Sequence, residues 1–180
     1  MIKMNWRRCL CLGCLVIGLV ALGAIGWGDR ALALEGQSPI IAIGNLKQDF
    51  TYSDLSRQDL SEQNLVGASL AAADARDADF THADLSQTIL TKGVFLNAKM
   101  IGVNLSKSFA DRVIFDGADL TDAVVVDAIM TSSTFNDAII TGADFSGTIL
   151  DRYQIVQLCK YADGVNSVTG VSTRDGLGCR

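Results

Sequence analysis

Bulky apolar residues recur at every fifth position of this chain. Residues 80–100 read FTHADLSQTILTKGVFLNAKM, and the same register holds from Phe50 to Leu150, where all 21 positions divisible by five are apolar. Five steps along an α-helix scatter side chains around its axis, and five steps along a flat strand reverse the face each time. A chain that turns a corner every few residues can instead point every fifth side chain to one axis. The period therefore predicts an all-β solenoid.

The residues around each bulky position also repeat. A small residue usually stands two positions earlier, Asp or Asn stands one position earlier, and Ser or Thr often follows, which gives the consensus A-D-L-S-x. In tandem over residues 48–151, this motif resembles the pentapeptide-repeat family. The resemblance implies a right-handed quadrilateral β-helix with four repeats, or 20 residues, in each of about five coils. Pro39, the single proline, precedes the array and so cannot interrupt its backbone ladder.

The N-terminus has the pattern of a secretory leader. Residues 9–27 form an apolar run that follows Arg7 and Arg8, and Ala31-Leu32-Ala33 has the small-x-small form of a signal-peptidase site. We predict a signal peptide over 1–33, cleaved after Ala33. The alternative is an uncleaved membrane anchor, because the run nearly reaches spanning length.

Both ends of a solenoid need covers. We expect residues 34–47 to form an N-terminal arm that caps the first coil with its isoleucines. At the other end, residues 152–180 are expected to form a C-terminal cap. Because Tyr153, Val156, Gln157 and Lys160 stand at helical spacing, a short amphipathic helix that covers the last coil is predicted over 152–163, with Gly164 as its stop.

Cysteine usage supports export. Cys159 and Cys179 are the two cysteines outside the leader, and an even pair in an exported chain suggests one disulfide, with two separate thiols as the alternative. The C-terminal sequence resembles the cap of thylakoid-lumenal pentapeptide-repeat proteins. We therefore expect the thylakoid lumen of a cyanobacterium or a bacterial periplasm.

The charge argues against a nucleic-acid clamp. The leader holds four of the 15 basic and one of the 20 acidic residues, which leaves 11 basic and 19 acidic residues and a net charge of −8. Such a chain suits a soluble protein that does not bind nucleic acid. We expect a monomer that contacts a membrane only through its leader, if the leader is uncleaved.

The sequence offers few parts for catalysis. His82 is the single histidine and is expected to face outward, and no P-loop, nucleophile elbow or zinc-spaced cysteine and histidine set is present. The many aspartates follow the repeat, so we expect them to bond turn backbone rather than metal. We predict no enzymatic activity and no cofactor.

Stacking at 20 residues aligns outward residues in columns. One column holds four large apolar residues where the motif prefers Asp or Asn, namely Ile89, Phe109, Ile129 and Ile149, and the neighbouring column adds Val94 and Ile114. An outward apolar column usually marks a contact, either with the chain's own termini or with a partner. The leading hypothesis is a non-enzymatic structural or interaction module that presents these side chains to a protein. The alternative is an acidic DNA mimic that inhibits or protects DNA gyrase, which the export signal disfavours.

Overall fold

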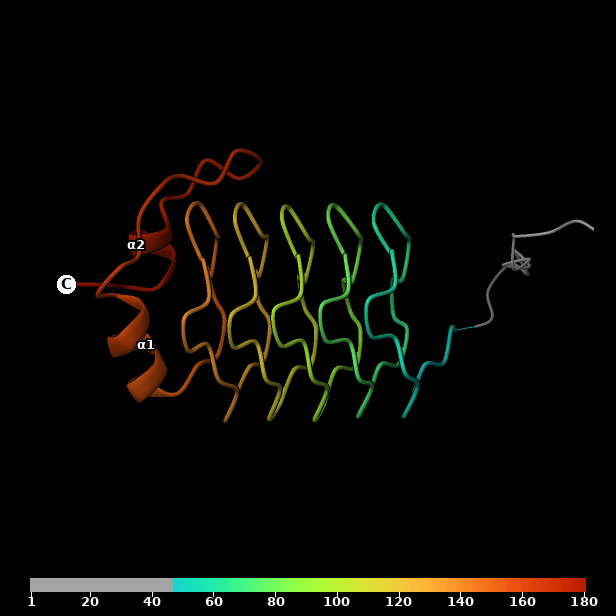
Figure 1. The fold of residues 1–180 in the computed structure, drawn as a ribbon. Helices are drawn as coiled ribbons and strands as arrows, with labels where there is room; N and C mark the ends of the chain where they lie inside the picture. Colours follow the sequence, from blue (N-terminus) through green and yellow to red (C-terminus); the bar gives the residue numbers. More distant parts are fainter. Residues whose placement is uncertain (1–46) are drawn as a thin grey trace, which may run out of the picture. The chain divides into compact units, whose positions relative to one another are not determined.

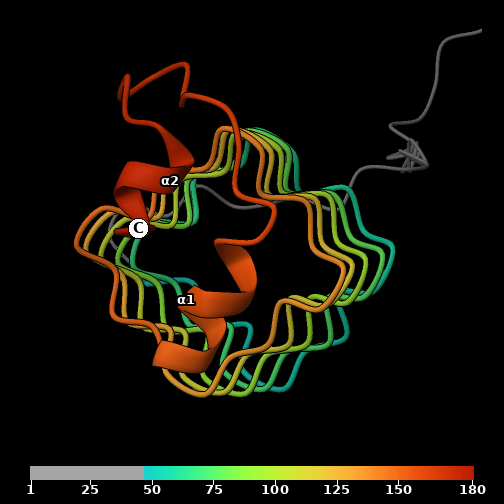
Figure 2. The ribbon, with the colours of Figure 1, turned by 90° about the vertical axis from the view of Figure 1, so that its left-hand side faces the viewer.

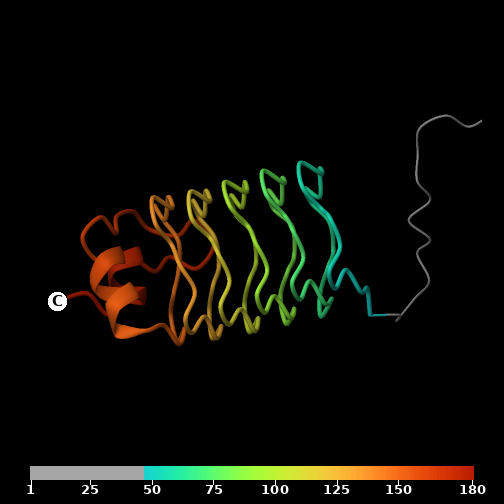
Figure 3. The same cartoon turned by 60° about the horizontal axis from the view of Figure 1, so that its bottom comes forward.

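The structure, a computed structural model, describes residues 47–180, in which the chain winds into a stack of similar coils (Figure 1, Figure 3). Parallel bridges join each outward face residue to the one 20 positions later, in columns that start at Asp49, Asp54, Asp59 and Asn64. These four columns give each coil four faces, and the first column continues to Ile149, which makes five coils. The predicted 20-residue coil is confirmed.

Backbone hydrogen bonds hold neighbouring coils together. The Phe50 amide donates to the Ser69 carbonyl (2.7 Å), and the Ser69 amide donates back to the Gln48 carbonyl (2.9 Å). In the described coils each face contributes one isolated bridge per coil rather than a longer strand. At each corner the chain makes a β-turn, such as the one closed by Ser53 N–H to Phe50 O (3.0 Å), and its third residue, Tyr52, has φ 58°. This left-handed conformation, typical of a type II turn, recurs every fifth residue up to Gly147.

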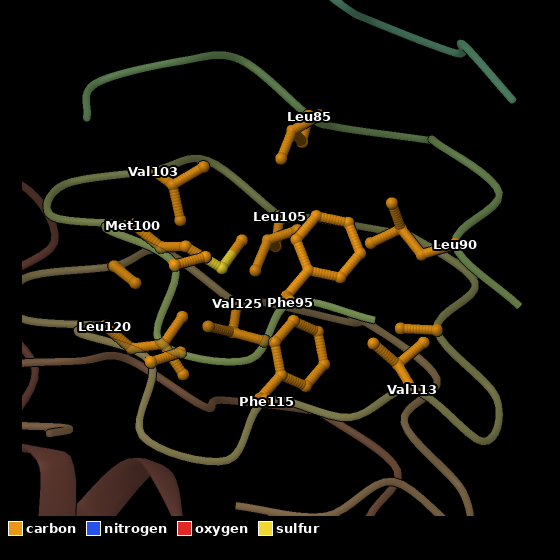
Figure 4. Close-up of a cluster of buried hydrophobic side chains, with 14 of the residues drawn as sticks. Leu85, Leu90, Phe95, Met100, Val103, Leu105, Val113, Phe115, Leu120 and Val125 are labelled. Carbon is orange, nitrogen blue, oxygen red and sulfur yellow. The ribbon is translucent and has the colours of Figure 1, made fainter. Parts of the chain in front are cut away.

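The interior is filled as the five-residue period predicts. All 21 positions of the period from Phe50 to Leu150, including the smaller Ala75 and Ala110, belong to the hydrophobic core or pack against it. Phenylalanines stack along one inner corner, with ring centroids 5.6 Å apart for Phe95 and Phe115 and 5.2 Å apart for Phe115 and Phe135. Figure 4 shows the first pair one above the other, surrounded by leucine, valine and methionine side chains. Gly93, two positions before Phe95, leaves room for that ring, because a Cβ there would lie 2.8 Å from Cε2 of Phe95.

Two short helices lie at the C-terminal end of the stack (Figure 2). Helix α1 spans Arg152–Leu158 and helix α2 spans Thr173–Gly176. Leu158 is buried in the hydrophobic core. The predicted disulfide is present between Cys159 and Cys179, with Cα atoms 5.6 Å apart.

The helix predicted over 152–163 is wrong in its length. Helix α1 ends at Leu158, before Gly164. Of the residues whose spacing indicated the helix, Tyr153 is 68% and Val156 is 52% exposed. The helix turns Leu158 inward, with Ile155 half-buried, while Val156 and Tyr153 face outward.

A hairpin over residues 165–172 connects the helices and is fixed by one buried amide. The Asn166 side chain donates to the carbonyls of Asp122 (3.1 Å), Ala123 (3.2 Å) and Gly142 (2.9 Å). Its Oδ1 accepts the two backbone amides of Val168 and Thr169. Asn166 therefore ties the hairpin to the last two coils.

The signal peptide over 1–33, its cleavage site at Ala31 and Ala33, and the arm before Lys47 lie outside the described residues. Between residues 47 and 180, the helices are too short and too polar to cross a bilayer.

Candidate protein-interaction surface

The predicted apolar column is a continuous row on one face of the solenoid. Parallel bridges link Ile89 to Phe109, Phe109 to Ile129, and Ile129 to Ile149. Bridged neighbours in adjacent coils lie about 4.8 Å apart. Ile89, Phe109 and Ile149 are 37%, 43% and 54% exposed, and Ile129 is half-buried. We call these four residues the apolar stripe.

The neighbouring face extends the stripe around a corner. Val94 is bridged to Ile114, which is 39% exposed, and the column continues to Thr134. The corner between the two faces is formed by Asp111 and Arg112. The structure thus brings all six predicted surface residues together in two adjacent columns.

The apolar residues in these columns lack a hydrogen bond that Asp and Asn make at the same position of the motif. All ten Asp and Asn residues at the outward face positions accept the backbone amide two residues later, as predicted. At Asp79, for example, the Thr81 amide (3.0 Å) and hydroxyl (2.6 Å) both donate to Oδ1. Isoleucine and phenylalanine cannot accept such bonds. The stripe therefore exposes apolar surface and loses turn bonds at the same positions.

The turn bonds also set the acidity of the faces. Hydrogen bonds from the Thr81 hydroxyl and amide hold the pKa of Asp79 below its ordinary value, and the Lys99 ammonium, 3.4 Å from Asp79 Oδ2, acts in the same direction. At Asp144, burial alone would raise the pKa, but bonds from the Ser146 hydroxyl and amide leave it lowered. These faces therefore carry ionised carboxylates at neutral pH.

Cations stand at the corner beside the stripe. Lys92, Arg112 and Arg152 are exposed there. Arg112 is held by Asp111, with Nε 2.7 Å from Oδ2, and hydrogen bonds from Thr131 and then Arg112 lower the pKa of Asp111. This corner is therefore less acidic than the aspartate-rich faces.

The described C-terminal segment does not lie over the stripe. Its hydrogen bonds to the coils end on residues such as Asp122, Phe135, Ile140 and Gly142, which belong to other columns or corners. The N-terminal arm, the other candidate cover, falls almost entirely outside the described residues. In residues 47–180, the stripe remains on the surface.

The side chains that could bind a metal ion do not cluster in the described part of the chain. His82 is exposed and leans over Gly102 in the next coil. In residues 47–180, His, Cys, Asp and Glu side chains nowhere gather in threes that could hold a metal ion.

Two features of the surface were missed from the sequence. Ile139 is 49% exposed on another face, beside Asp119. Ile139 stands 20 positions after Asp119, so the same alignment that predicted the stripe also predicts that Ile139 faces outward. The outer face of α1 was missed because its direction depends on how the helix meets the last coil.

Comparison with known proteins agrees with this geometry. The sequence model of the family described as "Pentapeptide repeats" matches residues 53–91, 78–117 and 114–152 in eight copies. The thylakoid lumenal protein TL20.3 of Arabidopsis thaliana chloroplasts is 57% identical over 37 residues, which cover 21% of this chain and 13% of that protein. The aligned part is thus a small fraction of that relative's length.

Solved structures of pentapeptide repeat proteins are also similar. One from the Arabidopsis thaliana thylakoid lumen is 34% identical, covering 71% of this chain and 88% of its own, with a TM-score of 0.48. Another, from Nostoc Pcc 7120, is 20% identical, covering 58% and 86% of the respective chains, with a TM-score of 0.49. With its 20-residue coils and the family match over more than half of its length, the chain belongs to the pentapeptide-repeat family, whose fold is a right-handed β-helix solenoid.

Proposed function

We propose that this protein is a non-enzymatic interaction module of an exported compartment, and that it docks on a protein partner through the apolar stripe. The observation that carries the proposal is the unbroken row Ile89–Phe109–Ile129–Ile149, exposed where the repeat favours Asp or Asn. Contiguous exposed apolar surface on a soluble protein commonly marks a contact site.

The surroundings of the stripe support a protein partner. These side chains stand on a backbone that is hydrogen-bonded from coil to coil, so docking on them requires little ordering of the backbone. The cations Lys92, Arg112 and Arg152 at its edge favour a partner with acidic groups around an apolar patch. The lumenal relatives and the predicted leader support an exported location, either the thylakoid lumen or a periplasm.

Affinity capture from the native compartment tests this function. The bait is compared with Phe109→Asp plus Ile129→Asp, and with a matched control, Val66→Asp plus Ile139→Asp, which places the same charges at exposed apolar sites outside the stripe. We expect the stripe variant to lose a partner that the wild type and the control both retain. Equal recovery of every partner by all three baits would rule out the stripe as the docking site.

A further inference from the structure

Charge is distributed unevenly between the solenoid and its cap. Residues 47–151 carry seven basic and 16 acidic side chains, a net charge of −9. Residues 152–180 carry four basic side chains (Arg152, Lys160, Arg174 and Arg180) and two acidic ones, a net charge of +2. The C-terminal end is thus the basic end of an acidic solenoid.

The same end exposes amphipathic and apolar side chains. Tyr153 is 68%, Val156 52% and Tyr161 45% exposed. Figure 2, which looks at this end, shows α1 in front of the coils. Tyr153 and Val156 are three residues apart and share the outer face of this helix, while its inner face buries Leu158.

Clefts flank α1 on both sides. One, of about 340 Å³, lies between the helix and the corner at residues 135–137 and is lined by Tyr153, Lys160 and Tyr161 among others. The other, of about 550 Å³, is lined by Arg152, Val156 and Arg180 among others. The first cleft combines an aromatic wall with Lys160 and with the carboxylate of Asp137, whereas the second combines an apolar wall with Arg152 and Arg180 and holds no acidic side chain.

We propose that the C-terminal cap docks on the surface of an anionic lipid bilayer, with the outer face of α1 against the headgroups. Tyrosine places an apolar ring and a polar tip at headgroup depth, and arginine and lysine extend aliphatic stems whose charges reach phosphate. Arg152 and Lys160 supply an electrostatic attraction, and the exposed Tyr153 and Val156 supply an apolar contact. Peripheral binding to a bilayer requires both.

The distribution of charge indicates both what the cap contacts and how the protein is oriented on it. The solenoid, with a net charge of −9, is repelled by an anionic bilayer, whereas the cap, at +2, is attracted. End-on docking keeps the carboxylates away from the lipid and leaves the apolar stripe free on the side. The two sites share Arg152, but Phe109→Asp plus Ile129→Asp changes the stripe alone and Tyr153→Ser plus Val156→Ser changes the cap alone, so either proposal can fail by itself.

Vesicle flotation tests the proposal. The protein is recovered after export, with its N-terminus determined by mass spectrometry, and all variants share that N-terminus. Vesicles contain equimolar phosphatidylglycerol and phosphatidylcholine, or phosphatidylcholine alone. The variants are Tyr153→Ser plus Val156→Ser, and Arg152→Gln plus Lys160→Gln. The matched control is Tyr52→Ser, because Tyr52 is 82% exposed in the first coil.

We expect the wild type and the control to float with the anionic vesicles only, and binding to weaken as salt is added. Each cation removed should weaken binding about fivefold. All variants alter exposed side chains, and circular dichroism checks that they fold. Absence of wild-type flotation, equal binding to both vesicle types, or unchanged binding of both cap variants would overturn the proposal. So would flotation lost equally in Tyr52→Ser. Salt-sensitive head-to-tail association without flotation, measured by sedimentation, would instead assign the cap to a second copy.

Discussion

Asn97 lies directly beneath Gly117 in the next coil, and its Oδ1 occupies the space that a Cβ of Gly117 would need. Gly117 also has φ +66°, so the position favours glycine for two reasons. The same relationship joins Asp122 to Gly142 and Asp127 to Gly147. At these corners, the identity of one residue restricts the residue 20 positions later.

Replacing Gly117 should therefore be costly, and part of the cost should depend on Asn97. We expect Gly117→Ala to lower the free energy of unfolding by about 1–3 kcal/mol. In an Asn97→Ala background, the cost should shrink by about 1 kcal/mol, because the steric conflict is gone while the left-handed φ remains. A double-mutant cycle in urea measures this coupling, and strict additivity would contradict it.

A substitution at the centre of the phenylalanine stack should strongly lower the free energy of unfolding. Phe115 is fully buried and has a stacked ring on either side. We expect Phe115→Ala to lower the free energy of unfolding by about 3–5 kcal/mol. The control Phe115→Leu should cost about 1–1.5 kcal/mol, since most of the volume is kept. Equal costs for the two variants in chemical denaturation would contradict this expectation, because the larger cavity left by alanine would then add nothing.

Asn166 predicts a similarly sensitive position in the cap. Its amide satisfies three backbone carbonyls, so Asn166→Ala leaves buried acceptors without that donor and should cost at least about 2 kcal/mol. Val168→Ala, at an exposed position of the same hairpin, should change stability by less than about 0.5 kcal/mol. Hydrogen exchange checks the mechanism, because the Val168 and Thr169 amides donate to Asn166 and should lose protection only in the first variant.

Stability should fall in acid. Turn hydrogen bonds lower the folded-state pKa of several carboxyls, including Asp79 and Asp144. Unfolded aspartate protonates near pH 4, and these folded carboxyls protonate at lower pH. Their contribution is therefore complete at neutral pH and is lost progressively as the pH falls below about 5. Urea midpoints across this range measure the loss. Asp79→Asn and Thr81→Val should each flatten the profile, and a wild-type profile that rises in acid would refute the argument.

Much of the solenoid could be predicted because one local pattern repeats. Every fifth residue points to the same apolar interior, so the period alone predicts the core from Phe50 to Leu150. The 20-residue coil then predicts the outward row that contains Phe109. The turn role of the aspartates followed from the chemistry of a short carboxylate next to free amides.

The cap could not be predicted in the same way because it has no period. The spacing of Tyr153 and Val156 indicated a helix, but contact with the last coil determines that Leu158 is buried while these two residues stay exposed. Asn166 looks like an ordinary loop asparagine, and its importance comes from carbonyls that lie at least 24 positions earlier in the chain.

Because bridged residues in neighbouring coils are 20 positions apart, the position of a residue in the sequence fixes the face of the solenoid on which it lies. Deleting one repeat of five residues between Phe109 and Ile129 would preserve the inward apolar series but rotate everything beyond it by a quarter turn. Thr134 would then stand above Phe109, and Ile129 would join the column of Asn104. A deletion that keeps every inward position apolar would thus break the phenylalanine stack and erase the exterior pattern, whereas loss of a whole coil would only shorten both.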